Sequence, residues 1–274
     1  MANFMKPIRL FWSGGNNSMI NYGDELSAVI VAALGQRQVV YTNAASADLA
    51  AIGSILHGVC RRQWRRAFYM RRQPIVLWGT GSIRSEPMIR NCALEVRAVR
   101  GPKTLRLFTS GGLKPFGDPG LLAPMLLDGA APVKKSVRWG IIPHVVDLEN
   151  PLVRRLADEN MHSRVIDLRN PDLISTTRQI AECDFVVSSS LHGLVVADAF
   201  SVPNIRARFS DQIAGGDWKF DDYAESIGRL DIMPADLYKN CNLQNFEDKI
   251  DIKHFQNIPA LCAALEACFP DDVF

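Results

Sequence analysis

The sequence lacks long apolar runs, a strong net charge and an apolar leader. No apolar stretch approaches the roughly 18 residues that a membrane-spanning helix needs, and residues 1–11 carry charges where a secretory signal would be apolar. The 31 basic and 29 acidic side chains give a formal net charge of +2, which provides no general attraction for nucleic acid. We therefore expect a soluble, cytoplasmic protein that binds no nucleic acid.

Several motifs of well-understood chemistry are also absent. The chain has no C-x-x-C pair, no H-E-x-x-H, no G-x-S-x-G nucleophile elbow and no G-x-G-x-x-G dinucleotide fingerprint. We therefore expect neither a metal ion nor a bound cofactor. The cysteines lie partly within apolar runs, which indicates reduced, buried thiols and not a disulfide framework; they are Cys60, Cys92, Cys183, Cys241, Cys262 and Cys268.

The composition that is present is that of an ordinary globular protein, with 47% hydrophobic and 22% charged residues. Short apolar runs alternate with helix-like segments, which is typical of parallel sheets covered on both faces. We predict the α/β class, with two Rossmann-like domains, 1–125 and 126–274, that face each other across a cleft. The Gly- and Pro-rich region 111–132 marks their boundary. Predicted strands cover 7–12, 39–42, 74–78, 94–99, 136–142, 165–167, 184–187 and 203–206, and predicted helices cover 24–34, 102–109, 151–159, 173–183, 191–200 and 258–268.

The strongest candidate for catalysis is His192. It follows a predicted buried strand and three serines, and it lies at the start of a predicted helix. In open α/β sheets, anions bind where a strand's carboxyl end meets a helix amino terminus, and a histidine there can transfer protons near neutral pH. A helix-capping or core histidine explains this stretch equally well. Ser189, Ser190 and Leu191 are candidate binding residues at the same junction.

Other candidate binding residues also follow predicted strands. Asn21, Gly23 and Asp24 lie in the loop after the first strand, where Asp24 is the predicted cap of the next helix. A tight turn with a helix cap explains this loop without a ligand. Glycines at strand ends let a backbone approach a ligand closely, and such positions recur here with small hydroxyl residues, at Gly53, Ser54, Gly79, Gly81 and Ser82.

Charged candidates complete the set. Arg100, at the end of a predicted strand, can hold a carboxylate or phosphate with its planar guanidinium, although a surface salt bridge is the simpler interpretation. His144 and Lys219 are further candidates outside any metal-ligand spacing. The arginine- and aromatic-rich segment 61–72 suits contact with anionic phospholipid or a lipid-linked diphosphate, and a solvated helix face is the simpler interpretation.

Taken in order, these motifs resemble the polysaccharide pyruvyl transferase family, and most closely its bacterial exopolysaccharide ketalase branch. The resemblance covers most of the chain. It rests on Asn21-Tyr22-Gly23-Asp24-Glu25-Leu26, Ala47-Asp48-Leu49, Ile52-Gly53-Ser54-Ile55-Leu56, Val99-Arg100-Gly101-Pro102-Lys103-Thr104, Gly117-Asp118-Pro119-Gly120-Leu121-Leu122, Ile142-Pro143-His144, Ser188-Ser189-Ser190-Leu191-His192-Gly193, Asp198-Ala199-Phe200 and Pro203.

The resemblance implies a glycosyltransferase-B-like fold, with the acceptor bound to the first domain and the donor to the second. It implies transfer of a pyruvyl group from phosphoenolpyruvate to two hydroxyls of a sugar, which forms a cyclic ketal and releases phosphate. His192 would act as general acid or base, and Arg100 would hold the donor. Many relatives have Arg-Leu-His where this chain has Ser190-Leu191-His192, so Arg206 and Arg208 are expected to supply the missing positive charge.

The partners that the resemblance implies are phosphoenolpyruvate and a saccharide acceptor, either an exopolysaccharide or a lipid-linked oligosaccharide. A lipid-linked acceptor would bring the protein into peripheral contact with the inner face of the membrane. Two other functions remain open, because a fold does not fix a function. They are a nucleotide-sugar-dependent glycosyltransferase and a non-catalytic sugar-binding relative, which the serine at position 190 favours.

Overall fold

The computed structural model describes residues 6–15, 20–61, 73–85, 93–108, 114–127, 133–229, 232–239 and 241–274. Its first half contains a five-stranded sheet of order β2-β1-β3-β4-β5, in which every pairing is parallel. The strands are β1 (Ile8–Phe11), β2 (Val39–Tyr41), β3 (Leu49–Ala50), β4 (Ile75–Thr80) and β5 (Leu94–Val99). All six residues of β4 are buried, as expected for a parallel strand covered on both faces.

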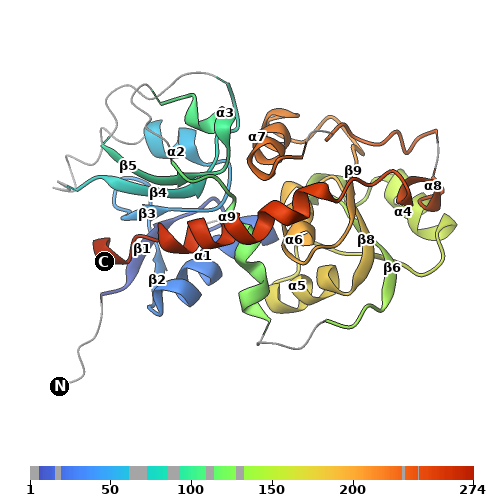
Figure 1. Cartoon of the computed structure of the whole chain (residues 1–274), viewed down its shortest axis with the longest axis horizontal. Coiled ribbons are helices and arrows are strands. Elements are labelled where there is room, and N and C mark those ends of the chain that lie inside the picture. Colours follow the sequence, from blue (N-terminus) through green and yellow to red (C-terminus); the bar gives the residue numbers. More distant parts are fainter. Residues whose placement is uncertain are drawn as a thin grey trace.

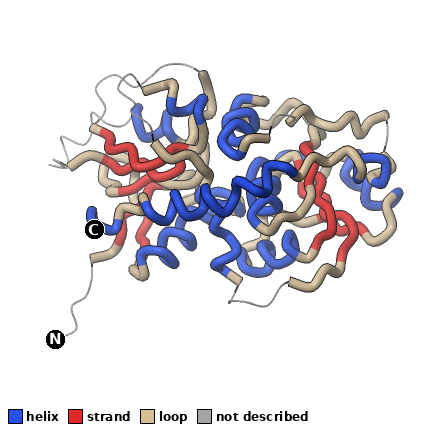
Figure 2. The backbone as a smooth tube through the Cα atoms, in the orientation of Figure 1, coloured by secondary structure: helices blue, strands red, loops and turns tan. Residues whose placement is uncertain are grey.

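A second parallel sheet has the order β7-β6-β8-β9. Its strands are β6 (Val137–Ile142), β7 (Ser163–Val165), β8 (Cys183–Ser188) and β9 (Asn204–Arg206). Figure 2 shows the two sheets in opposite halves of the molecule, with helices between them. The α/β class and the parallel sheets are therefore confirmed. Strand β7 ends at Val165, where the sequence had predicted a strand to begin.

Helix α1 (Tyr22–Gly35) begins two residues earlier than predicted, because its cap is Asn21 and not Asp24. The Asn21 side chain accepts a hydrogen bond from Gly23 N, which satisfies one of the amides that a helix amino terminus leaves free. The prediction that Asp24 caps this helix is wrong. Asp24 instead lies in the first turn, so its carboxylate remains available for other contacts.

The remaining helices of the two halves follow their strands. They are α2 (Leu56–Arg61), α3 (Pro102–Leu105), α4 (Pro151–Glu159), α5 (Leu173–Ala181) and α6 (Leu191–Ala199). The 3-10 helix η2 (Pro119–Leu126) lies within the region that the sequence marked as a boundary, and it contacts α1, α5 and α6. Its residues 119–123 are buried, so this part of the region packs between the two halves.

The carboxyl-terminal part of the chain contains α7 (Trp218–Ile227), α8 (Gln244–Glu247), η4 (Lys253–Asn257) and α9 (Ile258–Ala267). Figure 1 shows α9 running from the second half back to the first. There, Trp78 donates a hydrogen bond from Nε1 to the carbonyl of Leu265 at 2.9 Å, and its ring meets Phe269 edge-on at 5.1 Å. The end of the chain is therefore part of the core of the first half.

Two further findings concern predictions from composition. No helix in the described ranges is long and apolar enough to cross a membrane. Cys60, Cys183 and Cys241 are buried, and the described cysteines form no disulfide; Cys92 lies outside the described residues. Most of the arginine-rich segment, residues 62–72, also lies outside them.

Candidate active site

Five of the predicted site residues lie close together where the two halves meet. Lys219 of α7 influences the pKa values of Asp24, His144 and His192, and the charge of Arg100 acts on both Lys219 and His192. We call Asp24, Arg100, His144, His192 and Lys219 the junction cluster. They come from positions as far apart in the sequence as 24 and 219, and perturbed pKa values gathered in one place are typical of functional sites.

His192 is the second residue of α6, and its ring lies between α1 and η2. A Cβ atom at Gly23 would lie only 1.8 Å from His192 Nδ1, so the ring occupies the space that a side chain at position 23 would fill. On its other side, Nε2 lies 3.7 Å from Asp118 Oδ2. The side chain is 12% exposed. Burial lowers the pKa of His192, Lys219 and Arg100 lower it further, and Asp118 opposes them.

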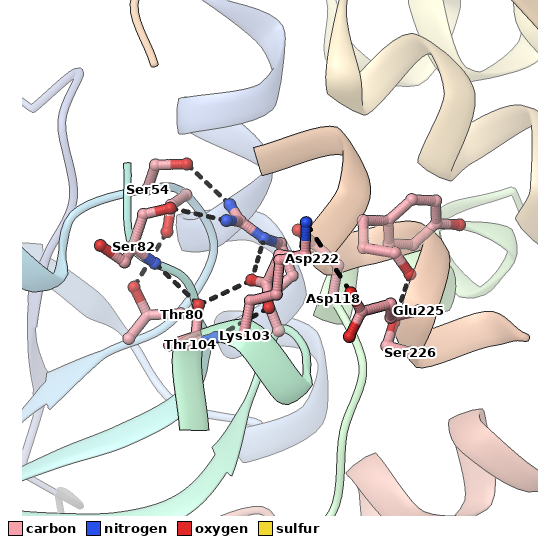
Figure 3. Close-up of polar contacts among 12 residues, drawn as sticks. Ser54, Thr80, Ser82, Lys103, Thr104, Asp118, Asp222, Glu225 and Ser226 are labelled. Carbon is pink, nitrogen blue, oxygen red and sulfur yellow. Dashed lines mark hydrogen bonds and ion pairs between the residues drawn. The ribbon is translucent and has the colours of Figure 1, made fainter. Parts of the chain in front are cut away.

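Arg100 is fully buried and holds three partners. Its Nε donates to Asp222 at 3.0 Å, Nη1 to Ser54 Oγ at 2.6 Å and Nη2 to the Ser82 carbonyl at 2.7 Å, as Figure 3 shows. Gly81 makes room for the guanidinium, because a Cβ there would lie 2.2 Å from Arg100 Cζ. Placed in this way, Arg100 presents no surface to a ligand. It anchors the junction from within, and the expected direct contact with a donor would require it to move.

The carboxylate that Arg100 contacts belongs to α7. Asp222 also accepts hydrogen bonds from Thr104 N at 2.8 Å and Thr104 Oγ1 at 2.6 Å, so it joins α7 to α3 and β5 (Figure 3). Gly101 allows the close approach, because a Cβ there would lie 1.9 Å from the Asp222 carbonyl oxygen. Lys219 lies one helical turn before Asp222 on α7, so this contact also fixes where Lys219 lies.

Lys219 is the cation of the cluster with no fixed partner. It forms no hydrogen bond or ion pair with any residue that the structure describes, whereas Lys103 pairs with Asp221 at 2.8 Å. Burial and the nearby charges of Arg100 and Arg206 lower the pKa of Lys219 to about 8, although Asp24 opposes them. Its Nζ lies over the Phe220 ring, 5.4 Å from the centroid. A half-buried ammonium group held by a ring face and by no carboxylate is well suited to bind an anionic ligand.

Asp24 and His144 complete the cluster. The Asp24 carboxylate lies beside Gly53, since a Cβ there would be 3.6 Å from Asp24 Oδ1. Burial raises the pKa of Asp24 to about 6, with a smaller rise from Glu25. Burial, aided by the charges of Lys219 and His192, lowers the pKa of His144 to about 4. The first turn of α6 contains His192 and so lies at the same junction. The Ser190 side chain, at the cap position, forms no hydrogen bond with the amides of this turn.

Other predicted site residues have structural partners. Ser189 donates to Asp147 at 2.9 Å and accepts from His144 N, Leu191 is buried in the core, and a Cβ at Gly79 would meet Pro119. Arg206 and Arg208 both bind Asp217. The interpretation that these two arginines compensate for Ser190 therefore finds no support in their contacts, and Lys219 is the better placed cation.

Two residues of this site, Asp118 and Asp222, were given no role by the sequence, and only Asp118 lies in a quoted motif. Asp118 follows Gly117 in the Gly-Asp-Pro-Gly segment, and Asp222 follows Lys219 by one turn. The helical periodicity of Phe220, Tyr223 and Ile227 would have predicted α7, but the polar residues between them obscured it. In the described part of the chain, no three or more His, Cys, Asp or Glu side chains are grouped so that they could hold a metal ion.

Comparison with known proteins gives a family profile and similar relatives. The family profile described as polysaccharide pyruvyl transferase matches residues 10–207. A relative from Acanthamoeba polyphaga mimivirus, the uncharacterized protein L143, is 29% identical over 68% of this chain and 64% of its own length. The succinoglycan biosynthesis protein ExoV of Rhizobium meliloti (strain 1021) is 27% identical over 49% of this chain and 41% of its own length.

The family match spans more than half of the chain and includes Asp24, Arg100, His144 and His192. The chain spans less than two thirds of the length of either relative. The resemblance that the ordered motifs indicated is confirmed by the profile, and the chain belongs to the polysaccharide pyruvyl transferase family.

Proposed function

We propose that this protein transfers the pyruvyl group of phosphoenolpyruvate to two hydroxyls of a saccharide and so forms a cyclic ketal. Family membership supports pyruvyl transfer. The observation that carries the choice of donor is Lys219, a half-buried cation without a fixed partner beside His192. Phosphoenolpyruvate has the two anionic groups that such a site would bind. A glycosyltransferase-B-like arrangement of the two sheets is part of this proposal.

The donor is held by two features in this proposal. Lys219 binds one anionic group, and the uncapped amino terminus of α6, directly after Ser190, binds the other. Arg100 helps to position Lys219 through Asp222, because this carboxylate fixes the helix that carries Lys219. No cofactor or metal ion takes part, since the donor itself supplies the activated enol.

The reaction balances with proton transfers alone. C3 of the enol gains a proton, both acceptor oxygens bond to C2, and the bond from C2 to the phosphate oxygen breaks. The two acceptor hydroxyls lose two protons. One of them balances the proton that C3 gains, and the other ends on the released phosphate. His192 transfers protons at C3 and at a hydroxyl. Asp24 can accept a hydroxyl proton, because burial raises its pKa to about 6.

The acceptor is a sugar of an exopolysaccharide or of its lipid-linked precursor, bound on the side of the first sheet. Asp24, Asn21 and Gly53 lie on that side of the junction cluster. If the acceptor is lipid-linked, the protein works in the cytoplasm in peripheral contact with the inner face of the membrane. It has no nucleic-acid partner in this proposal.

Phosphate release from phosphoenolpyruvate, with and without a candidate acceptor, tests the proposal. His192→Ala should lower turnover by at least about 100-fold, because general acid–base catalysis contributes roughly 10²–10⁴-fold. His162→Ala, which changes an exposed histidine outside the cluster, is the matched control and should keep full activity. Circular dichroism should show both variants folded.

Three results would redirect the proposal. Full turnover by His192→Ala would exclude its role in proton transfer. Thermal stabilisation by nucleoside diphosphates, with none by phosphoenolpyruvate, would instead indicate a nucleotide-sugar glycosyltransferase. Binding of saccharide alone would indicate a non-catalytic relative.

A further inference from the structure

Two buried polar atoms face each other beside the junction cluster without forming a hydrogen bond. They are Asp118 Oδ2 and His192 Nε2, which lie 3.7 Å apart. Neither atom has a hydrogen-bond partner in the described part of the chain, and Asp118 is fully buried. Buried polar atoms without partners are rare in folded proteins because each loses its hydrogen bonds to water and gains none in return. This pair therefore requires an explanation.

The fold fixes the direction of the Asp118 carboxylate. Asp118 caps η2, and its Oδ1 accepts a hydrogen bond from Gly120 N at 2.9 Å. Because Oδ1 is held in this way, Oδ2 is left facing the imidazole. Gly120 allows the tight turn that holds Oδ1, since a Cβ there would lie 2.9 Å from Val195 Cγ1 and 3.1 Å from Asp118 Oδ1. The capping contact thus orients Oδ2 toward Nε2.

The other ring nitrogen of His192 faces a different surface. Nδ1 lies against Gly23 and has no hydrogen-bond partner in the described ranges. Gly23 precedes Asp24, so Nδ1 is the nitrogen on the side of α1 and the acceptor-side residues. The two nitrogens are therefore distinct, with one directed to a buried carboxylate and the other to the junction.

We infer that Asp118 is a positioning residue that accepts a hydrogen bond from the Nε2–H group of His192 and so keeps the lone pair on Nδ1. Nδ1 is then the nitrogen that exchanges protons with donor and acceptor, a role that rests on the proposed function. The gap of 3.7 Å closes to hydrogen-bond distance when substrate binds, as catalytic hydrogen bonds do in other enzymes. A carboxylate that contacts one ring nitrogen of a histidine and so fixes its tautomer is a recurrent arrangement in enzymes.

The charges around His192 explain why such a carboxylate is needed. Lys219 of α7 and Arg100, which directly follows β5, both disfavour the imidazolium, and burial does so more strongly. His144, which caps the 3-10 helix η3 (Val145–Asp147), also lies within range of His192. Asp118 is the group that favours the protonated ring. Without its charge, the pKa of His192 would fall further, and the histidine would be a weaker acid–base group near neutral pH.

Asp118→Asn tests the inference, because the amide can keep the contact with Gly120 N while it places an N–H group against Nε2. Nitrogen-15 spectra of labelled histidine should show the Nε2–H tautomer of His192 in the natural protein and the Nδ1–H tautomer in the variant. Turnover should fall by about 10²–10⁴-fold. The limb of the kcat pH profile that belongs to His192 should move to lower pH, because a favourable negative charge is removed.

Asp198→Asn is the matched control. Asp198 is also fully buried, and its Oδ1 lies 2.9 Å from Nε2 of His254, outside the junction cluster. Asp198→Asn should lower the thermal stability of the protein, but the limb of the kcat pH profile that belongs to His192 should not move. The Nδ1–H tautomer in the natural protein, or an unchanged tautomer in folded Asp118→Asn, would overturn the inference. If the natural protein released no phosphate from phosphoenolpyruvate while the tautomer switched, the proposed function would fail and the positioning role would stand.

Discussion

At the scale of single residues, glycine positions decide where the catalytic candidate lies, because a glycine has no Cβ atom to block a neighbouring ring. His192 occupies the volume beside Gly23 that a Cβ atom would fill at 1.8 Å from Nδ1. Arg100 and Gly81 repeat the arrangement, with 2.2 Å between Cζ and the position of a Cβ. The glycines that the sequence marked as ligand contacts therefore act, at these positions, by admitting protein side chains.

Gly23→Ala should displace the imidazole and lower turnover by about 100-fold or more, because an ångström of misplacement costs about that much. The melting temperature should also fall, since the clash with a buried ring outweighs the helix preference of alanine. Phosphate release and thermal unfolding measure the two effects. Gly58→Ala in α2 is the control, where a Cβ would contact Phe11 at an ordinary 3.6 Å. Equal activity of the two variants would show that His192 does not depend on Gly23.

The same scale shows what the sequence could predict about the site. The sequence singled out His192, Asp24 and Lys219 separately, and the fold brings the three side chains within electrostatic range of one another. Arg206 was chosen for its nearness to Ser190 in the sequence, but its side chain binds Asp217. Arg206 pairs with Asp217 because the fold places the start of α7 beside the end of β9. A local sequence pattern does not show which distant segments meet in this way.

At the scale of elements, α7 is one of the parts of the second half that contact the first half. Asp222 accepts bonds from Arg100 and Thr104, while Asp221 pairs with Lys103 nearer the surface. The Arg100-to-Thr104 motif thus forms the docking surface for α7. Since Lys219 lies one turn away, a substitution in this surface should affect both the stability of the protein and its affinity for the donor.

Asp222→Ala should lower the free energy of unfolding by about 3–5 kcal/mol, because Arg100 would be left buried without a counter-charge. Urea unfolding measures the change. Asp221→Ala removes a neighbouring, more exposed carboxylate, and it should cost no more than about 1 kcal/mol. Similar losses in the two variants would mean that the buried pair does not hold α7 in place.

The elements themselves could largely be predicted. The parallel strands and most helices follow from alternating apolar runs, and α4 has the predicted bounds. Helix α7 was missed because charged residues interrupt its apolar face, and η2 was missed because its Pro and Gly residues resemble a linker. Both are stabilised by burial between the two halves, which a local pattern does not reveal.

At the scale of the whole molecule, two parallel sheets meet across helices, and the chain crosses between them more than once. Helix α9 returns to the first half, where Leu265 accepts a hydrogen bond from Trp78 (Figure 1). The junction cluster draws on both halves, so its geometry depends on how they are joined. This arrangement places a cation without a fixed partner, Lys219, beside His192 and Asp24.

Calorimetric titration with phosphoenolpyruvate tests the central claim, that this cluster binds an anionic enol donor, most directly. The natural protein should bind it at pH 7, and the affinity should decline as pH rises above about 8, where Lys219 loses its proton. Lys219→Met should lose at least about tenfold in affinity, while Lys239→Met, which changes an exposed lysine paired with Asp236, should bind normally. Unchanged binding by folded Lys219→Met, or no binding by the natural protein, would contradict the account.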